Sequence, residues 1–188
     1  MGDQCEYVQD GTASRPVNLP PVTGVPRTGK VAYVITTNQG DVKITLDRAK
    51  APCTVNSFTS LVGQGFYDQT RCHRLADNGL FMLQCGDPTG TGKGGPGYTL
   101  ADEVTGNEVY AAGTVAMAND SRPNTGGSQF FLVYLDSDLP PGYTVFGTID
   151  RNGLGVVNRI AAEGQDGSNP DGTGRPNNPA EIIKIMKS

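Results

Sequence analysis

Two neighbouring segments decide the fold: Cys72-His73-Arg74-Leu75 and Leu80-Phe81-Met82-Leu83-Gln84-Cys85-Gly86-Asp87. The short polar sequence between them favours a turn, so the segments are expected to pair as a β-hairpin. Side chains alternate between the two faces of a strand, which puts Arg74, Met82 and Gln84 on compatible faces of this hairpin. The sequence therefore predicts one cation and one amide set among large apolar side chains, with neither a general base nor a nucleophile.

Short strand-forming segments recur on both sides of this hairpin, between 26 glycines and 13 prolines. Residues 31–36 and 42–47 alternate between apolar and polar around a turn at 38–40, which is typical of a second hairpin. Further strands are expected at 71–75, 80–85, 114–118, 128–134, 145–149 and 181–187. One helix begins at Pro52 and ends at Gly63 and Gly65, and another covers 154–162. The pattern predicts a mostly β fold, a closed antiparallel barrel with two helices covering its ends.

The chain divides by composition into two parts. Residues 1–29 are rich in proline and poor in large apolar groups, so we expect an extended tail or linker, followed by a domain over 30–188. The net charge of −4 and the scattered Lys and Arg residues argue against nucleic-acid binding. No apolar run in the sequence is long enough for a membrane helix, and no signal peptide is evident.

The four cysteines, Cys5, Cys53, Cys72 and Cys85, contain no CxxC pair, which argues against a zinc ribbon or a redox motif. Three disulfide pairings are possible, and the sequence does not choose among them. Free thiols in a cytosolic protein and disulfides in an oxidising compartment both fit. Cys5 favours the second, because a cysteine in a polar tail has no packing reason to be there.

Several familiar motifs fail on context. The run 90–95 satisfies GxGxxG, but Pro96-Gly97 follows it where a dinucleotide site needs a helix. The single histidine, His73, leaves a catalytic zinc site without ligands, and we expect it to lie in the core on the face opposite Arg74. Ser128 lacks the GxSxG context of a hydrolase nucleophile. The run 166–172 has a calcium-like composition without the terminal Glu, so we expect an acidic surface loop. No metal and no cofactor are predicted.

Seven blocks, in this order, resemble the signature motifs of cyclophilins, and the resemblance covers residues 31–187. The blocks are His73-Arg74, Gly79-Leu-Phe-Met-Leu-Gln84, Gly86-Asp87, Thr89-Gly90-Thr91-Gly92, Met117-Ala118-Asn119, Gly127-Ser128-Gln129-Phe130-Phe131 and Val145-Phe146-Gly147. The resemblance implies a closed eight-stranded antiparallel β-barrel capped by two α-helices. It also implies peptidyl-prolyl cis/trans isomerisation of proline-containing peptides and of unfolded or secreted proteins.

The resemblance assigns a role to each matching residue. Arg74 looks like the catalytic arginine, and residues 89–95 resemble the loop near the residue that precedes proline. The expected walls of the proline pocket are Phe81, Met82, Phe131 and Leu139. The groups expected to hold the peptide beside it are Gln84, Ala118, Asn119 and Gln129, and Tyr143 is included in the substrate site.

Three departures from the family pattern stand out. Asp138 occupies the place of a frequent Trp, Tyr143 replaces a frequent His, and the loop 120–126 is one residue longer than the common form. Because the family's Trp supports binding of cyclosporin, we expect weakened inhibition by that cyclic peptide. A proline-peptide binding or chaperone module with little turnover is the alternative function.

The finer resemblance is to membrane-tethered bacterial cyclophilins, often called peptidyl-prolyl isomerase B. Their layout of linker and domain would account for residues 1–29. It implies an extracytoplasmic domain of a membrane-tethered parent chain, with a cytoplasmic location left open.

Overall fold

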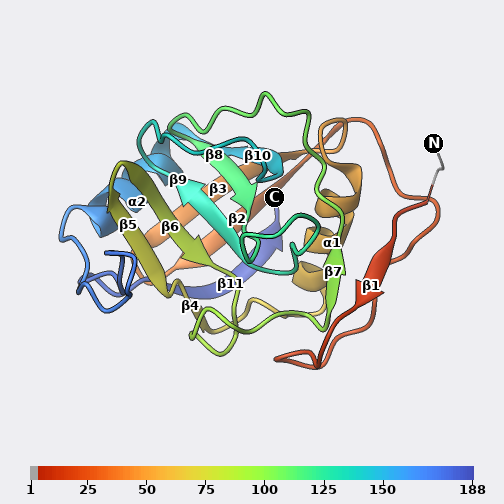
Figure 1. The fold of residues 1–188 in the computed structure, drawn as a ribbon, viewed down its shortest axis with the longest axis horizontal. Helices are drawn as coiled ribbons and strands as arrows, with labels where there is room; N and C mark the ends of the chain where they lie inside the picture. Colours follow the sequence, from red (N-terminus) through yellow and green to blue (C-terminus); the bar gives the residue numbers. More distant parts are fainter. Residues whose placement is uncertain (1–3) are drawn as a thin grey trace.

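The computed structural model describes residues 4–188, in which one large curled sheet is flanked by two helices (Figure 1). The nine strands of this sheet run in the order β4-β11-β2-β3-β10-β8-β9-β6-β5, and all of the pairings are antiparallel. Their bounds are β2 Lys30–Thr37, β3 Gly40–Asp47, β4 Thr70–Arg71, β5 Arg74–Asn78, β6 Leu80–Cys85, β8 Thr114–Met117, β9 Phe130–Val133, β10 Val145–Ile149 and β11 Glu181–Lys187.

The prediction of a closed eight-stranded barrel was wrong, because the sheet is a curled half-barrel whose two edge strands, β4 and β5, do not pair with each other. The predicted strand 71–75 divides at Cys72-His73, and each half pairs with a different neighbour. β4 pairs with β11 and β5 pairs with β6, so the two edges of the sheet come from consecutive pieces of chain. The covalent chain, and not a hydrogen-bonded ladder, therefore connects the two edges.

The main core lies on the inner face of the sheet, as the alternation in the first hairpin predicts. Tyr33 and Ile35 of β2, and Ile44 and Leu46 of β3, are all almost completely buried. The ring of Phe58, on the helix α1 (Pro52–Gly63), contacts four other aromatic rings in this core. Those rings belong to Tyr33, Tyr67, Phe130 and Phe146.

The two helices begin where carboxylates accept hydrogen bonds from their first turns. α1 has the predicted bounds at Pro52 and Gly63, and Glu103 accepts from the backbone N–H groups of Cys53 and Thr54. α2 (Arg151–Ala161) begins three residues before the predicted start, because Asp150 caps the N–H of Gly153.

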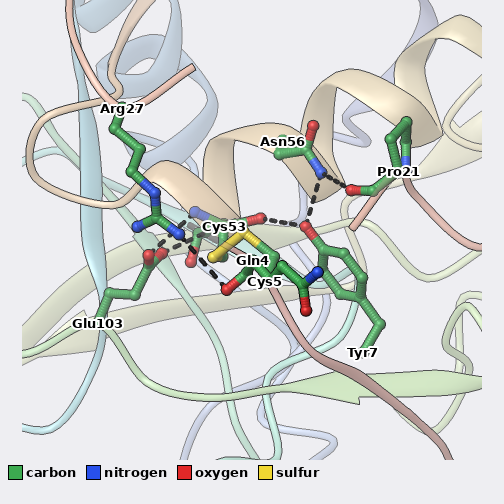
Figure 2. Close-up of a disulfide and its surroundings, with 9 residues drawn as sticks. Gln4, Cys5, Tyr7, Pro21, Arg27, Cys53, Asn56 and Glu103 are labelled. Carbon is green, nitrogen blue, oxygen red and sulfur yellow. Dashed lines mark hydrogen bonds between the residues drawn. A yellow bond between two sulfur atoms is a disulfide. The ribbon is translucent and has the colours of Figure 1, made fainter. Parts of the chain in front are cut away.

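The N-terminal segment, residues 4–29, lies against the domain and α1 (Figure 1). Two strands that the sequence did not indicate, β1 (Tyr7–Gln9) and β7 (Tyr98–Leu100), form a separate antiparallel sheet. Figure 2 shows the Cys5–Cys53 disulfide that ties the segment to the first turn of α1. Close to this disulfide, the Tyr7 hydroxyl donates to the Cys53 carbonyl and accepts from Asn56.

Farther along the same segment, Arg15 donates to the backbone carbonyls of Gly65, Phe66 and Asp68. The expected tail is thus attached to the domain at several points, although residues 1–3 lie outside the described part. The division into 1–29 and 30–188 stays a prediction, and its boundary falls at the start of β2. No helix within residues 4–188 is long and apolar enough to cross a membrane.

Candidate functional site

A second apolar cluster lies on the outer face of the sheet, over β5, β6, β8 and β9. Its buried members include Ala76, Met82, Ala116, Phe131 and Val133. The register of the sheet explains their grouping, because Met82 is opposite Ala76 and Val133, and Phe131 is opposite Ala116. Strand alternation therefore gives this part of the sheet two apolar faces, one for the core and one for a site.

A cavity of about 650 Å³ opens above this cluster. Its apolar wall combines Met82 and Phe131 with Leu80, Leu139 and Tyr143, and the rings of Tyr143 and Phe131 lie 5.6 Å apart. The predicted substrate residues Arg74, Met82, Gln84, Ala118, Asn119, Phe131, Leu139 and Tyr143 all line this one cavity.

Phe81 was expected as a wall of the same pocket, but the structure places it on the other face of β6. There it packs against the main core, with its ring 5.9 Å from that of Tyr134. β6 begins at Leu80, so regular alternation turns Leu80, Met82 and Gln84 toward the cavity and Phe81 away from it. Leu80 takes the lining position that the sequence analysis gave to Phe81.

The polar side of the cavity is a chain of hydrogen-bonded side chains that begins at Arg74. Arg74 Nη1 donates to Gln84 Oε1 at 2.9 Å, from the directly opposite position of the β5–β6 ladder. Gln84 Nε2 donates to Gln129 Oε1 at 2.8 Å, and Gln129 Nε2 donates to the carbonyls of Gly92 and Gly94. This chain fixes the amide and guanidinium groups relative to the loop at 88–95.

That loop is organised by Asp87, which is completely buried. Its carboxylate accepts from the backbone N–H groups of Thr89, Thr91, Gly92 and Gly94. Burial alone would raise the pKa of Asp87, but hydrogen bonds from the Thr89 hydroxyl and from the backbone N–H groups of Gly94, Thr89 and Gly92 outweigh it and lower the pKa. The loop is therefore held around a buried anion, a role that the sequence analysis did not assign to Asp87.

We expected strand alternation to turn His73 away from Arg74. His73 instead lies in the break between β4 and β5, where strand alternation does not apply. It lines the same cavity as Arg74 and is half-buried. Within residues 4–188, neither of its ring nitrogens has a hydrogen-bond partner. Burial lowers the pKa of His73 and favours the neutral imidazole.

A second disulfide, Cys72–Cys85, closes the ends of the hairpin that carries Arg74 and Gln84. With Cys5–Cys53 it leaves no free cysteine among residues 4–188. Ser128 is buried and donates to the Gly86 carbonyl, which gives its hydroxyl a structural role.

A neighbouring cavity shares Gln84, Ala118 and Asn119 with the first, and Gln129 lines this second space. Asn119 Nδ2 donates to the Gly142 carbonyl at 3.3 Å, which links it to the segment that carries Leu139 and Tyr143. Within the longer loop 120–126, Asp120 forms an ion pair with Arg122, and its carboxylate accepts a hydrogen bond from the Thr125 hydroxyl.

Asp138, which was expected to occupy the place of a frequent Trp, is exposed and is not among the residues that line the first cavity.

Sequence reasoning also missed Asp171 and Thr173. Arg74 Nη2 donates to Asp171 Oδ2 at 2.8 Å, and Arg74 Nε donates to Thr173 Oγ1 at 2.9 Å. Asp171 belongs to the run 166–172 that was expected to be an acidic surface loop, and Thr173 follows that run directly. Hydrogen bonds from the side chain and backbone of Thr173 and then from Arg74 lower the pKa of Asp171 to about 2. No local pattern in the sequence signals this long-range contact.

Taken together, the site places a fixed guanidinium and side-chain amides beside an apolar pocket on a β half-barrel, the arrangement of a ligand-binding site that orients a partly apolar ligand by a few polar groups. The family model described as "Cyclophilin type peptidyl-prolyl cis-trans isomerase/CLD" matches residues 32–187. The chain belongs to this cyclophilin family.

Named relatives agree with the family match. The "Probable peptidyl-prolyl cis-trans isomerase B" of Mycobacterium leprae is 46% identical and covers 92% of this chain, which spans 63% of that relative. The protein of the same name from Mycobacterium tuberculosis H37Rv is also 46% identical, with coverages of 99% and 64%. The chain thus spans less than two thirds of these relatives.

A solved structure agrees as well. A cyclophilin-type peptidyl-prolyl cis-trans isomerase of Cryptosporidium parvum has a TM-score of 0.74 and 32% identity, over 85% of this chain and 98% of that chain. A second crystal structure of that protein, obtained in the presence of the dipeptide Ala-Pro, has a TM-score of 0.72.

Proposed function

We propose that this chain accelerates cis/trans rotation about X–Pro peptide bonds in peptides and in unfolded or secreted proteins. The observation that carries the proposal is the position of Arg74, whose guanidinium is held at the polar side of an apolar cavity. The relative crystallised in the presence of Ala-Pro supports a proline residue as the ligand of that cavity.

The barrier to this rotation, about 18–20 kcal/mol, arises because turning the C–N bond sacrifices amide resonance. In the twisted state the proline nitrogen becomes pyramidal and regains a localised lone pair. On this proposal, Arg74 donates a hydrogen bond to that nitrogen, which accepts one only in the twisted state. An interaction of this kind lowers the barrier without tightening ground-state binding.

The remaining site residues hold the substrate while the bond turns. Met82, Phe131, Leu139 and Leu80 provide an apolar surface for the proline ring, which also limits water around the guanidinium. Gln84, Ala118, Asn119 and Gln129 offer hydrogen-bonding groups to the peptide backbone beside it. The chemistry requires no nucleophile, because no covalent bond is broken.

A charge-assisted hydrogen bond of about 3 kcal/mol, formed only in the twisted state, would accelerate rotation roughly a hundredfold. Restriction of the substrate in a drier cavity would add to this factor. Arginine suits the role because it stays charged and presents a rigid fork of donors, whereas lysine offers a single flexible point charge.

The proposal is tested by following cis-to-trans conversion of a short X–Pro peptide with NMR exchange spectroscopy, with and without the purified protein. Acceleration that saturates with peptide concentration is the expected result. Binding of the peptide with no acceleration would instead favour the alternative, a proline-peptide binding or chaperone module.

We also propose that the domain works outside the cytoplasm, as part of a membrane-tethered parent chain. The two disulfides support an oxidising compartment, because cytosolic thiols are kept reduced. Trapping of free thiols in cells that make the parent protein tests this placement. Four reactive thiols in the native protein would contradict it.

A further inference from the structure

The guanidinium of Arg74 donates hydrogen bonds to two residues of the loop 166–175, which lies outside the large sheet. Asp171 Oδ2 accepts from Nη2 at 2.8 Å and Thr173 Oγ1 accepts from Nε at 2.9 Å. Gln84 accepts from Nη1 at 2.9 Å, from the neighbouring strand β6. A guanidinium has five N–H donors, so three are occupied by the protein and two remain.

Asp171 and Thr173 are themselves held in place. The Thr173 hydroxyl donates to Asp171 Oδ1 at 2.6 Å, and the Thr173 backbone N–H donates to the same oxygen at 3.0 Å. Asn169 Nδ2 donates to Thr173 Oγ1 at 3.1 Å. Thr173 is only 9% exposed, so its hydroxyl bonds to Arg74 and Asp171 with little competition from water.

The loop is fastened to the sheet at the residue next to Arg74. The N–H of Leu75 donates to the Gly174 carbonyl at 2.7 Å, and the Gly174 N–H donates back to Leu75 at 3.2 Å. A side chain at position 174 would collide with Asp166 and Gln165. Glycine therefore lets residues 165–167 pack closely against position 174 within the loop that carries Thr173.

We infer that Asp171 and Thr173 are positioning residues, which hold the Arg74 guanidinium in the orientation that stabilises the twisted X–Pro bond. The inference rests on the proposed isomerase function. An arginine side chain has many rotamers. Because Thr173 and Asp171 accept hydrogen bonds from Nε and Nη2, the remaining N–H donors of the guanidinium keep a fixed direction. A small displacement of a catalytic group lowers the reaction rate by a large factor. The hydrogen bonds from Arg74 to Asp171 and Thr173 are therefore expected to raise kcat.

Because the Arg74–Asp171 ion pair is partly exposed, its effect on kcat can be distinguished from an effect on the stability of the fold. The side chains of Arg74 and Asp171 are 25% and 53% exposed, and ion pairs this open add little to the stability of a fold. Loss of this ion pair in Asp171→Asn is therefore expected to lower kcat while leaving the melting temperature and KM almost unchanged.

The sharpest variants are at Thr173, where valine keeps the shape and removes the hydroxyl. Thr173→Val is expected to lower kcat on the order of tenfold, and Thr173→Ser, which restores the hydroxyl, to recover most of it. Asp171→Asn should also lower kcat. Glu163→Gln removes the same charge from an exposed residue outside the loop and should leave kcat unchanged.

NMR supplies a readout that does not depend on turnover. The Arg74 Nε–H, which donates to Thr173 Oγ1, should give a slowly exchanging resonance that is lost in Thr173→Val and regained in Thr173→Ser. Parent-like kcat in both Thr173→Val and Asp171→Asn, with the parent active, would overturn the positioning role alone. An inactive parent protein would reject the proposed function itself and the positioning role with it.

Discussion

Removal of the Cys5–Cys53 disulfide is expected to lower the free energy of unfolding by about 4 kcal/mol. The bond joins residues 48 positions apart, and the chain-entropy relation for a cross-link of this span gives that figure. The second disulfide, Cys72–Cys85, spans 13 positions, for which the same relation gives about 3 kcal/mol. The longer loop should therefore account for the larger loss.

The folded state decides how much of this loss is observed. The N-terminal segment is also held by the β1–β7 pairing and by the three hydrogen bonds of Arg15. Tyr7 and Val25 are buried there against Tyr98 and Leu100. If these contacts keep the segment docked without the disulfide, the segment and the domain unfold together and the whole loss appears.

Urea denaturation of Cys5→Ala/Cys53→Ala and Cys72→Ala/Cys85→Ala, each compared with the parent, measures both losses. The first double variant should show a lower midpoint with an unchanged m-value. A loss below about 1 kcal/mol for Cys5→Ala/Cys53→Ala, beside a loss of about 3 kcal/mol for the other pair, would refute the reasoning. It would mean that the segment detaches before the domain unfolds.

Three further predictions concern single carboxylates. The folded pKa of Asp87 is lowered, so its stabilising effect is present above pH 4 or so and is lost as the pH falls through the folded pKa. The free energy of unfolding of the parent should fall as the pH is lowered through this range, and it should fall less steeply in Asp87→Asn. Equal pH dependence of the two unfolding free energies would contradict this prediction. Glu103→Gln should weaken the cap of α1 by about 1 kcal/mol in thermal melts, and no change would argue against the cap. Asp138→Trp should tighten cyclosporin inhibition by about tenfold in a dose series, and an unchanged inhibition constant would show that position 138 does not limit binding.

Much of the fold could be predicted because local patterns agree with it. The alternation over β2 and β3, the Pro52 helix start and the strands at β6, β10 and β11 were all readable from residue spacing. The short strands β1 and β7 were not, since three residues carry little periodicity and their pairing joins distant parts of the chain. The cysteine pairing was unreadable for the same reason.

The candidate site was predicted where motif and strand geometry coincide, and missed where tertiary contacts decide. Arg74, Met82 and Gln84 meet as the hairpin pattern indicated. Phe81, which the family resemblance assigned to the pocket, faces the core instead, because neighbouring residues of a strand point to opposite faces. Asp171 lies 97 positions from Arg74 in a loop whose composition suggests only solvent exposure. This contact depends on the tertiary fold, which brings the loop 166–175 against the edge strand β5.

The most direct test of the account compares X–Pro isomerisation by the parent protein with that by Arg74→Ala and Arg74→Lys, all three verified as folded. The account predicts fast conversion by the parent, a loss of roughly a hundredfold in Arg74→Ala, and little rescue by lysine. Near-normal turnover in a folded Arg74→Ala protein would contradict the central claim that the arginine stabilises the twisted bond.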